Sequence, residues 1–379
     1  MKHLHLFAFV CCLLLAACGS KEPAPAGPGT AQALAEAPFE LPKTFYKKLK
    51  GTIGDGIAVT MDLIKDDTTL SGTYYYDKVG LPLSLDGAID ADKQAHLLET
   101  NAQYTQTGAF EGKFSSAEVF EGTWTNPKKT KSLPFKLTET KEGVAGIAFE
   151  AHHQENCDNR ERYLKAPKAA DETWYTDTMC SYIDLLILKV TTGDAAASHA
   201  INEAIEDEVT TGEKEYASIK DYLNTINDVE ADEYLSLEQY CGVVTNDRNI
   251  LAVSVGAFEF AGGAHPNSWV GYLNFDIRTG KLLQLNDLLV PNGKAQLDRI
   301  GERLFLGDNG DMDGESLAWD FEPGNFKLNE NFAITTGGLL FTFNPYEIGP
   351  YVMGAPQVFI PYKEMKALVK KDGPLGQFL

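Results

Sequence analysis

A five-residue pattern recurs in the first third of the chain and restricts the folds open to that region. Each copy has two large apolar residues four positions apart, with a glycine midway between them. The copies are Leu70–Tyr74, Leu85–Ile89, Phe110–Phe114 and Phe120–Trp124. In a β-strand, these three positions point to the same face. A glycine there lets the backbone bend or approach a neighbour closely, as a curled sheet requires. The pattern therefore predicts strands of a curved sheet.

The whole segment 43–140 has the features of an all-β module. Large apolar residues alternate with small or polar ones in its first part, which is typical of a half-buried strand. These residues are Ile57, Val59, Met61 and Leu63, and turn sequences follow at 65–67, 90–92 and 126–127. We expect a meander of about eight strands, curled into a half-open or closed barrel. Its interior holds either a ligand or side chains, and we expect side chains.

The chain begins with an apolar segment of the kind that directs export. The eleven-residue run Phe7–Ala17 is too short to span a bilayer, which needs about 20 residues. It ends in LAACGS, which resembles a bacterial lipobox, so residues 1–17 are predicted to be a lipoprotein signal peptide. In such proteins the signal peptide is cut off immediately before the cysteine. Cys18 would then be the residue that carries the lipid, with fatty acyl chains such as palmitate. An ordinary signal peptide is the alternative.

The residues after this segment indicate where the protein is expected to lie. Gly19 stands where an aspartate would retain a lipoprotein in the inner membrane, by analogy with the sorting rule of two-membrane bacteria. Residues 18–42 are rich in Pro, Ala and Gly and are predicted to be a flexible linker. We expect a lipid-anchored protein of the cell envelope, on the outer membrane, facing the periplasm or the cell surface.

Charge excludes one class of partner. The formal net charge is −21, from 33 basic and 54 acidic residues. Nucleic acid requires a basic face, so no nucleic-acid role is expected. Protein charge also disfavours docking on anionic lipids, so contact with the membrane is expected through Cys18. A cationic partner would be attracted, although an acidic surface also serves solubility.

Three cysteines remain after the lipid site, and an exported protein lies where disulfides persist. Cys157 and Cys180 enclose 22 residues and are the pair that we predict to be joined, although three cysteines allow three pairings. Cys241 lies in an apolar run, where a buried thiol acts as a small hydrophobe.

Residues 141–379 combine helices and strands. Helices are predicted from apolar residues at helical spacing, and strands from apolar runs bounded by turns. The helices are expected at 195–209, 216–226, 294–306 and 363–370, and the strands at 236–246, 249–260, 268–277, 281–285, within 324–345, and at 358–362. The elements are clustered rather than strictly alternating, which indicates an α+β fold with an antiparallel sheet.

One hairpin in this region is the best candidate site. Gly262 and Gly263 precede His265, and two adjacent glycines allow positive φ or a close approach. The ligand-binding candidates are Gly262, Gly263, His265, Tyr346 and Glu347. His265 is the best titratable candidate, and Asp276 or Asp287 would have to lie beside it for base catalysis. The alternative is that His265 only caps a strand and contacts the turn at 344–351.

The hairpin and the C-terminal strands carry a resemblance. GGAHPNSWVGYLNFDIRTGKLLQLNDLL and the later NFAITTGGLLFTFNPYEIGPYVMGAPQVFIPYKEMKALV closely resemble the extracytoplasmic domain of RsiV-like proteins. That family is a domain of unknown function and includes an anti-sigma factor that recognises lysozyme. Residues 145–240 resemble the module that precedes it and that also accompanies the catalytic domain of PdaC-like peptidoglycan deacetylases. The resemblances imply a PdaC-like α+β module at 141–240 and an RsiV-like α+β domain at 241–379.

Motifs for other chemistry are weak. No Gly-x-Ser-x-Gly elbow, His-Glu-x-x-His helix or Walker loop occurs, so no catalytic residue or cofactor is predicted. His152, His153 and Cys157 lack a second ligand pair for a metal. The loop 309–320 imitates calcium-loop spacing but departs from it at both ends, and we interpret it as a solvated acidic turn. No metal is therefore predicted.

The sequence favours an envelope lipoprotein that is not an enzyme and that binds a protein, with lysozyme as one candidate, or a cell-wall glycan. One alternative is a glycan-modifying enzyme that uses His265 with a nearby carboxylate. Another is a structural spacer of the envelope.

Overall fold

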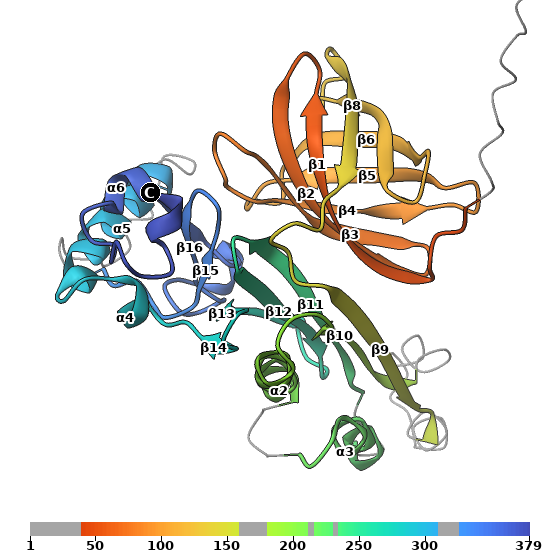
Figure 1. Ribbon diagram of the computed structural model, residues 1–379. Coiled ribbons are helices and arrows are strands. Elements are labelled where there is room, and N and C mark those ends of the chain that lie inside the picture. The colour runs from red at the N-terminus through yellow and green to blue at the C-terminus, as the bar shows by residue number, and fades with distance from the viewer. Residues whose placement is uncertain (1–38, 159–179, 211–215, 230–233, 310–325) are drawn as a thin grey trace, which may run out of the picture. The chain divides into compact units, whose positions relative to one another are not determined.

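The computed structural model describes residues 39–158, 180–210, 216–229, 234–309 and 326–379. The expected signal peptide, Cys18, most of the linker and the acidic loop from residue 310 onward lie outside these ranges. Residues 40–379 form one compact unit (Figure 1). In the part of the chain that is described, no helix combines the length and apolar character needed to cross a bilayer.

The first part is a closed eight-stranded antiparallel barrel, which confirms the expected curled meander and selects the closed form over the half-open one. Its strands are β1 (Thr44–Ile53), β2 (Ile57–Asp66), β3 (Thr69–Tyr76), β4 (Leu83–Ile89), β5 (Gln94–Thr100), β6 (Gln106–Phe114), β7 (Val119–Thr125) and β8 (Ser132–Glu139). β1 pairs with β8 and closes the ring. Gly122 explains why the pattern needs glycine, because a Cβ there would lie 2.1 Å from the carbonyl oxygen of Glu111.

Aromatic side chains fill the barrel. Phe110 packs edge-on against Tyr74 and Phe135, with centroids 5.2 Å apart in both pairs. Phe114 stacks on Phe120 at 5.0 Å. The prediction of an interior filled by side chains is therefore confirmed for these strands.

One ion pair on the outer side of the barrel is fully buried. Leu49 and Met61 face the barrel core, so their neighbours Lys48 and Asp62 face outward. The side chains of Lys48 and Asp62 are nevertheless 0% exposed, with Nζ and Oδ1 3.3 Å apart. Tyr46 donates to Asp62 at 2.6 Å and accepts from Asn246 at 3.2 Å, so this face of the barrel packs against the strand that carries Asn246.

A six-stranded sheet forms the middle of the chain, in the order β14-β13-β12-β11-β10-β9. The strands are β9 (Ile147–Asn156), β10 (Ser181–Val190), β11 (Ser236–Asp247), β12 (Ile250–Phe260), β13 (Asn267–Asp276) and β14 (Lys281–Leu282). The α+β class is confirmed, but β10 and β11 are parallel, unlike the antiparallel sheet expected. The expected division at residues 240 and 241 lies within β11, so the two expected modules share this sheet.

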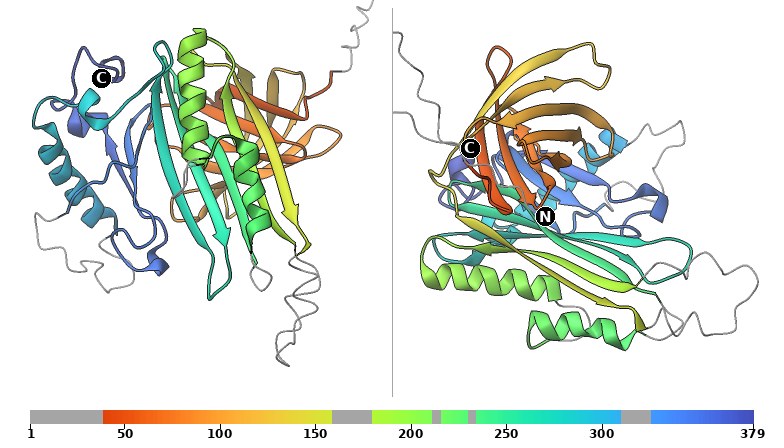
Figure 2. Two further views of the ribbon diagram at one scale, coloured as in Figure 1. Left: turned by 90° about the horizontal axis from the view of Figure 1, so that it is seen from below. Right: turned by 90° about the vertical axis from the view of Figure 1, so that its right-hand side faces the viewer.

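Two helices cover one face of the sheet (Figure 2). α2 (Ala195–Thr210) begins at Asp194, whose carboxylate accepts from the backbone N–H of Ala197 at 3.0 Å. α3 (Ile219–Asn224) begins later than the predicted start at residue 216, because Ser218 caps it by accepting from the N–H of Asp221. η1 (Thr225–Asp228) continues α3 as a 3₁₀ turn.

The C-terminal part packs helices on a three-stranded antiparallel sheet, β15-β16-β17. Its elements are α4 (Leu285–Leu288), α5 (Gly293–Asn309), β15 (Phe332–Ile334), β16 (Gly338–Thr342), η2 (Tyr351–Met353), β17 (Gln357–Pro361), α6 (Tyr362–Met365) and η3 (Gly376–Phe378). The helix predicted over 363–370 is wrong in extent, because α6 ends at Met365. Residue Val369 instead forms a β-bridge with Leu289.

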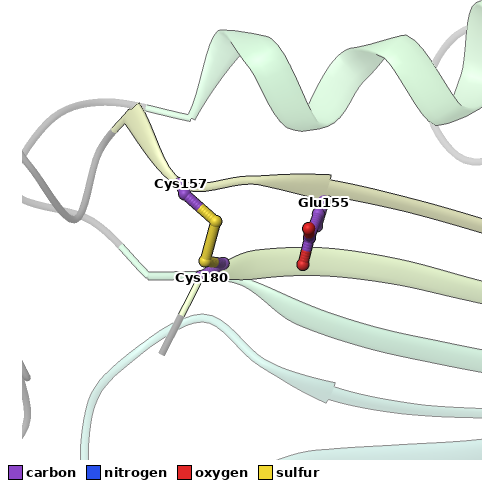
Figure 3. Close-up of side chains that lie close together, drawn as sticks. All are labelled: Glu155, Cys157 and Cys180. Atoms are coloured by element: carbon purple, nitrogen blue, oxygen red, sulfur yellow. A yellow bond between two sulfur atoms is a disulfide. The ribbon is translucent and has the colours of Figure 1, made fainter. Parts of the chain in front are cut away.

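The predicted disulfide joins the adjacent ends of β9 and β10 (Figure 3). Cys157 and Cys180 are bonded, with Cα atoms 4.5 Å apart. Cys241 is a buried free cysteine. Burial raises the pKa of its thiol to about 11, so it remains a thiol at neutral pH.

Candidate functional site

The turn between β12 and β13 carries the two glycines of the candidate site. Gly262 and Gly263 have φ of 87° and 95°, a region that side-chain-bearing residues rarely adopt. A Cβ at either position would meet no atom within 4 Å. The glycines are therefore required by backbone conformation rather than by close packing, and the turn is open to solvent.

His265 lies against the turn that follows β16. Its ring stacks on Tyr351, with centroids 3.9 Å apart and planes at 20°. Its Nδ1 lies 2.9 Å from the carbonyl oxygen of Pro266, and its Nε2 lies 3.4 Å from the hydroxyl of Tyr346. Tyr351 donates to the same Pro266 carbonyl at 2.7 Å. His265, Tyr346 and Tyr351 thus form an aromatic cluster.

The aromatic cluster is prominent on the surface. Tyr346 is 63% exposed and has φ of 73°, and the neighbouring Val352 is 89% exposed. Positive φ in a bulky residue is uncommon and marks strain that the surroundings must hold. Glu347, the other candidate of this turn, accepts from the side-chain amide of Asn329 at 2.8 Å. The five predicted ligand-binding candidates therefore lie in two turns that meet at His265.

Asparagine side chains hold the two turns together. Asn344 accepts from the backbone N–H of Val270 at 2.8 Å and donates to its carbonyl at 3.1 Å. Asn331 donates to the same carbonyl at 2.8 Å. Asn344 thus fixes the turn after β16 beside β13, and Asn331 fixes the start of β15 beside the same strand residue. Sequence reasoning missed both asparagines, because the residues they bind are 61 and 74 positions away.

Asp276 and Asp287 do not join His265 in a catalytic arrangement. Asp276 binds Arg278 through both carboxylate oxygens, at 2.9 and 2.6 Å, and these bonds hold the pKa of Asp276 below its usual value. Asp287 accepts from the backbone N–H of Gln284 and pairs with Lys281, and the same bonds lower its pKa. Both carboxylates thus stabilise local turns.

Replacing Asp276 with asparagine is expected to lower the free energy of unfolding by about 1 kcal/mol at pH 7, because charge-assisted bonds to a largely exposed arginine are lost. The folded-state pKa of Asp276 is depressed, so its contribution is present above the unfolded pKa and is lost as pH falls through the folded value. Urea unfolding at pH 7 and pH 3 measures this. A difference that is equally large at pH 3 would contradict the assignment.

Among the described residues, one group of three side chains has metal-ligand spacing, namely Glu155, Cys157 and Cys180 (Figure 3). Its two sulfur atoms are bonded to each other, so neither is a thiolate ligand in this state. The cluster of His152, His153 and Cys157 considered from the sequence loses its sulfur ligand for the same reason.

The chain thus consists of an all-β barrel followed by an α+β part with a mixed sheet. Comparisons with known families identify two families that match the α+β part. Residues 175–268 match the family described as Deacetylase PdaC. Residues 286–363 match the family described as Protein of unknown function (DUF3298). The chain therefore contains a PdaC-like module followed by a DUF3298/RsiV-like domain, as the resemblances implied.

Curated relatives match this chain over part of their length. A Mycobacterium tuberculosis protein named as an esterase is 31% identical over 107 residues, which is 27% of this chain and 45% of that protein. The immunogenic protein MPT64 of the same organism is 25% identical over 133 residues, or 32% of this chain and 53% of that protein. The chain thus spans about half the length of these relatives.

Two solved structures of the DUF3298 family are also similar. One, from Bacteroides fragilis, has a TM-score of 0.48 and 18% identity, covering 62% of this chain and 99% of the other. The second, from Pseudomonas aeruginosa, has a TM-score of 0.46 and 20% identity, covering 60% and 94%.

Proposed function

We propose that this protein is a non-catalytic, lipid-anchored binding protein of the cell envelope, on the outer membrane. Its ligand is a protein or a cell-wall glycan, and the aromatic cluster with Glu347 contacts it. The observation that carries this proposal is the arrangement of Tyr346 and Tyr351 around His265 on an exposed surface. Tyrosines on a rigid support supply much of the binding energy at recognition surfaces.

The arrangement of His265 favours recognition over base catalysis. A catalytic imidazole needs an orienting group and a reacting proton within reach. In the described residues, the hydrogen-bond partners of the His265 ring are the Pro266 carbonyl and the Tyr346 hydroxyl, and neither is a carboxylate. Glu347 is engaged by Asn329 instead. The ring therefore serves as a stacking surface and a polar contact.

The test is capture of a ligand by the immobilised chain. Lysozyme, soluble peptidoglycan fragments and an envelope extract are passed over it in turn, and bound material is identified by mass spectrometry. We expect one of these to be retained, and the acidic chain favours a cationic ligand. Retention of nothing from all three would overturn the binding role and leave the structural spacer.

A glycan-modifying enzyme is the second candidate, and two of the similarities favour it. One matched family is named for a deacetylase, and one relative is named as an esterase. This alternative would be established if the wild-type chain released acetate from acetylated peptidoglycan and the His265→Ala variant released none. Release at the same rate by the variant would exclude His265 as its catalytic group.

A further inference from the structure

A second cluster of functional side chains lies on the six-stranded sheet, on the face opposite α2 and α3. Ile183 and Leu185 of β10 belong to the core that also includes helix residue Ile201, so Tyr182 and Asp184 point to the other face. The register places Asp184 between His153 of β9 and Glu238 of β11, giving a row of three polar side chains.

Hydrogen bonds orient the side chains of this row. His153 Nδ1 lies 2.6 Å from Asp184 Oδ1, and Tyr182 donates to Glu238 Oε1 at 2.8 Å. Burial, followed by this bond to Glu238, raises the pKa of Tyr182 to about 12. Within the described residues, Asp184 Oδ2 and Glu238 Oε2 make no hydrogen bond. Two carboxylates in adjacent strands repel each other, and a cation between them would relieve that repulsion.

The row borders a cleft of about 540 Å³. This volume is within the roughly 300–1,000 Å³ of small-molecule sites. Asp66 and Thr69, at the turn from β2 to β3, line it together with Asp184, Glu238 and Tyr240. Among the described residues that line the cleft, three are acidic and none is lysine or arginine. The cleft therefore favours a positively charged ligand.

Tyr240 adds an apolar surface to this charge. It lies next to Leu186 in the register and is 51% exposed. An aromatic ring stacks on the apolar face of a pyranose and also attracts a cation placed over it. The hydroxyl of Thr69, which lines the cleft, is suited to hydrogen-bond a hydroxyl of a sugar.

We propose that this cleft binds an amino sugar that carries a free ammonium group, with the ammonium between Asp184 and Glu238 and the ring on Tyr240. An ammonium donates three hydrogen bonds, which matches carboxylate oxygens on two neighbouring strands. An N-acetylated sugar has lost this charge and is discriminated against. The site is separate from the aromatic cluster and does not depend on the function proposed for it.

Isothermal titration of the full-length chain with a β-1,4-linked glucosamine dimer tests the proposal. We expect binding at least about tenfold tighter than that of the N-acetylated dimer, because a charge-assisted bond is lost on acetylation. Asp184→Asn combined with Glu238→Gln is expected to weaken binding by about tenfold or more. Asp184→Asn alone is the second variant, because the side chain of Asp184 is 48% exposed and its replacement is expected to leave the fold intact.

Two controls separate this site from the rest of the molecule. Glu203→Gln removes an exposed acidic group from α2, on the other face of the sheet, and is expected to leave binding unchanged. Asp55→Asn, in the exposed turn between β1 and β2 and outside both sites, is also expected to leave it unchanged. The proposal would be overturned if the wild type bound neither dimer, or bound both with equal affinity. It would also be overturned if the cleft variants bound as tightly as the wild type, or if Nα-acetyl-lysine amide bound more tightly than the glucosamine dimer.

Discussion

Replacing Lys48 with methionine is expected to lower the free energy of unfolding by about 3–5 kcal/mol, because the substitution leaves Asp62 as an uncompensated buried charge. Both side chains of the pair are 0% exposed. Tyr46 still donates to Asp62 in the variant, but a neutral donor does not replace the lost positive charge. Urea unfolding followed by fluorescence at pH 7 measures the loss.

The stabilisation that the Lys48–Asp62 pair provides depends on pH through the pKa of Lys48. Burial is the largest single influence and lowers this pKa, but the charge of Asp62, its hydrogen bond, and the charges of Tyr75 and Asp247 together outweigh burial, so the pKa lies above its ordinary value. A raised lysine pKa means that the pair stabilises the fold fully below the unfolded pKa of about 10.4, and that this contribution is lost as pH rises through the folded value. The difference between wild type and variant is therefore expected to persist throughout neutral pH.

Lys136→Met is the matched control. This lysine lies on the same barrel and pairs with Glu121 at 3.1 Å, but the two side chains are 66% and 38% exposed. Its loss is expected to change stability by less than about 0.5 kcal/mol. If both variants were destabilised equally, the buried pair would not have the role described for it.

Local sequence patterns predicted most of the barrel because the pattern and the physical requirement coincide. Glycine at positions such as 112 and 122 is needed where neighbouring strands and rings approach closely. The buried pair on the outer surface was not predictable. Lys48 and Asp62 look like ordinary outward residues of amphipathic strands, and only the packing of a strand some 200 positions later, at Asn246, buries them.

The α+β part was predicted less completely. Alternation and turn sequences located β11, β12 and β13, but strand direction depends on how distant segments pair. The parallel contact of β10 with β11 was therefore missed. The closing helix was overestimated because residues 366–369 have helical composition, although tertiary pairing of Val369 with Leu289 ends it.

In the candidate site, too, features set by neighbouring residues were predictable from the sequence, and contacts between distant residues were not. Two adjacent glycines identified the His265 turn, and their positive φ is a local property. The partner ring of His265 is 86 positions away at Tyr351, which no spacing rule supplies. The row of His153, Asp184 and Glu238 was missed entirely. A polar residue such as Asp184 inside the apolar run YIDLLIL was the available signal, but its meaning depends on strand register.

Replacing Tyr346 with alanine is expected to weaken binding of the captured ligand by about tenfold to a hundredfold, because an exposed tyrosine on a fixed turn is a typical hot-spot residue. The side chain is 63% exposed, so little folding stability depends on it. His265→Ala removes the ring that stacks on Tyr351 and is expected to weaken binding by a similar factor.

Tyr104→Ala is the matched control for Tyr346→Ala. Tyr104 is 82% exposed and lies in a barrel turn, between β5 and β6. Its removal deletes the same chemical group from a different surface, and we expect unchanged affinity.

The direct measurement is surface plasmon resonance of the captured ligand on wild type, Tyr346→Ala and Tyr104→Ala, with folding of each checked by thermal melting. We predict a rise in Kd of at least about tenfold for Tyr346→Ala alone. Equal Kd for all three folded proteins would contradict the assignment of ligand binding to the aromatic cluster.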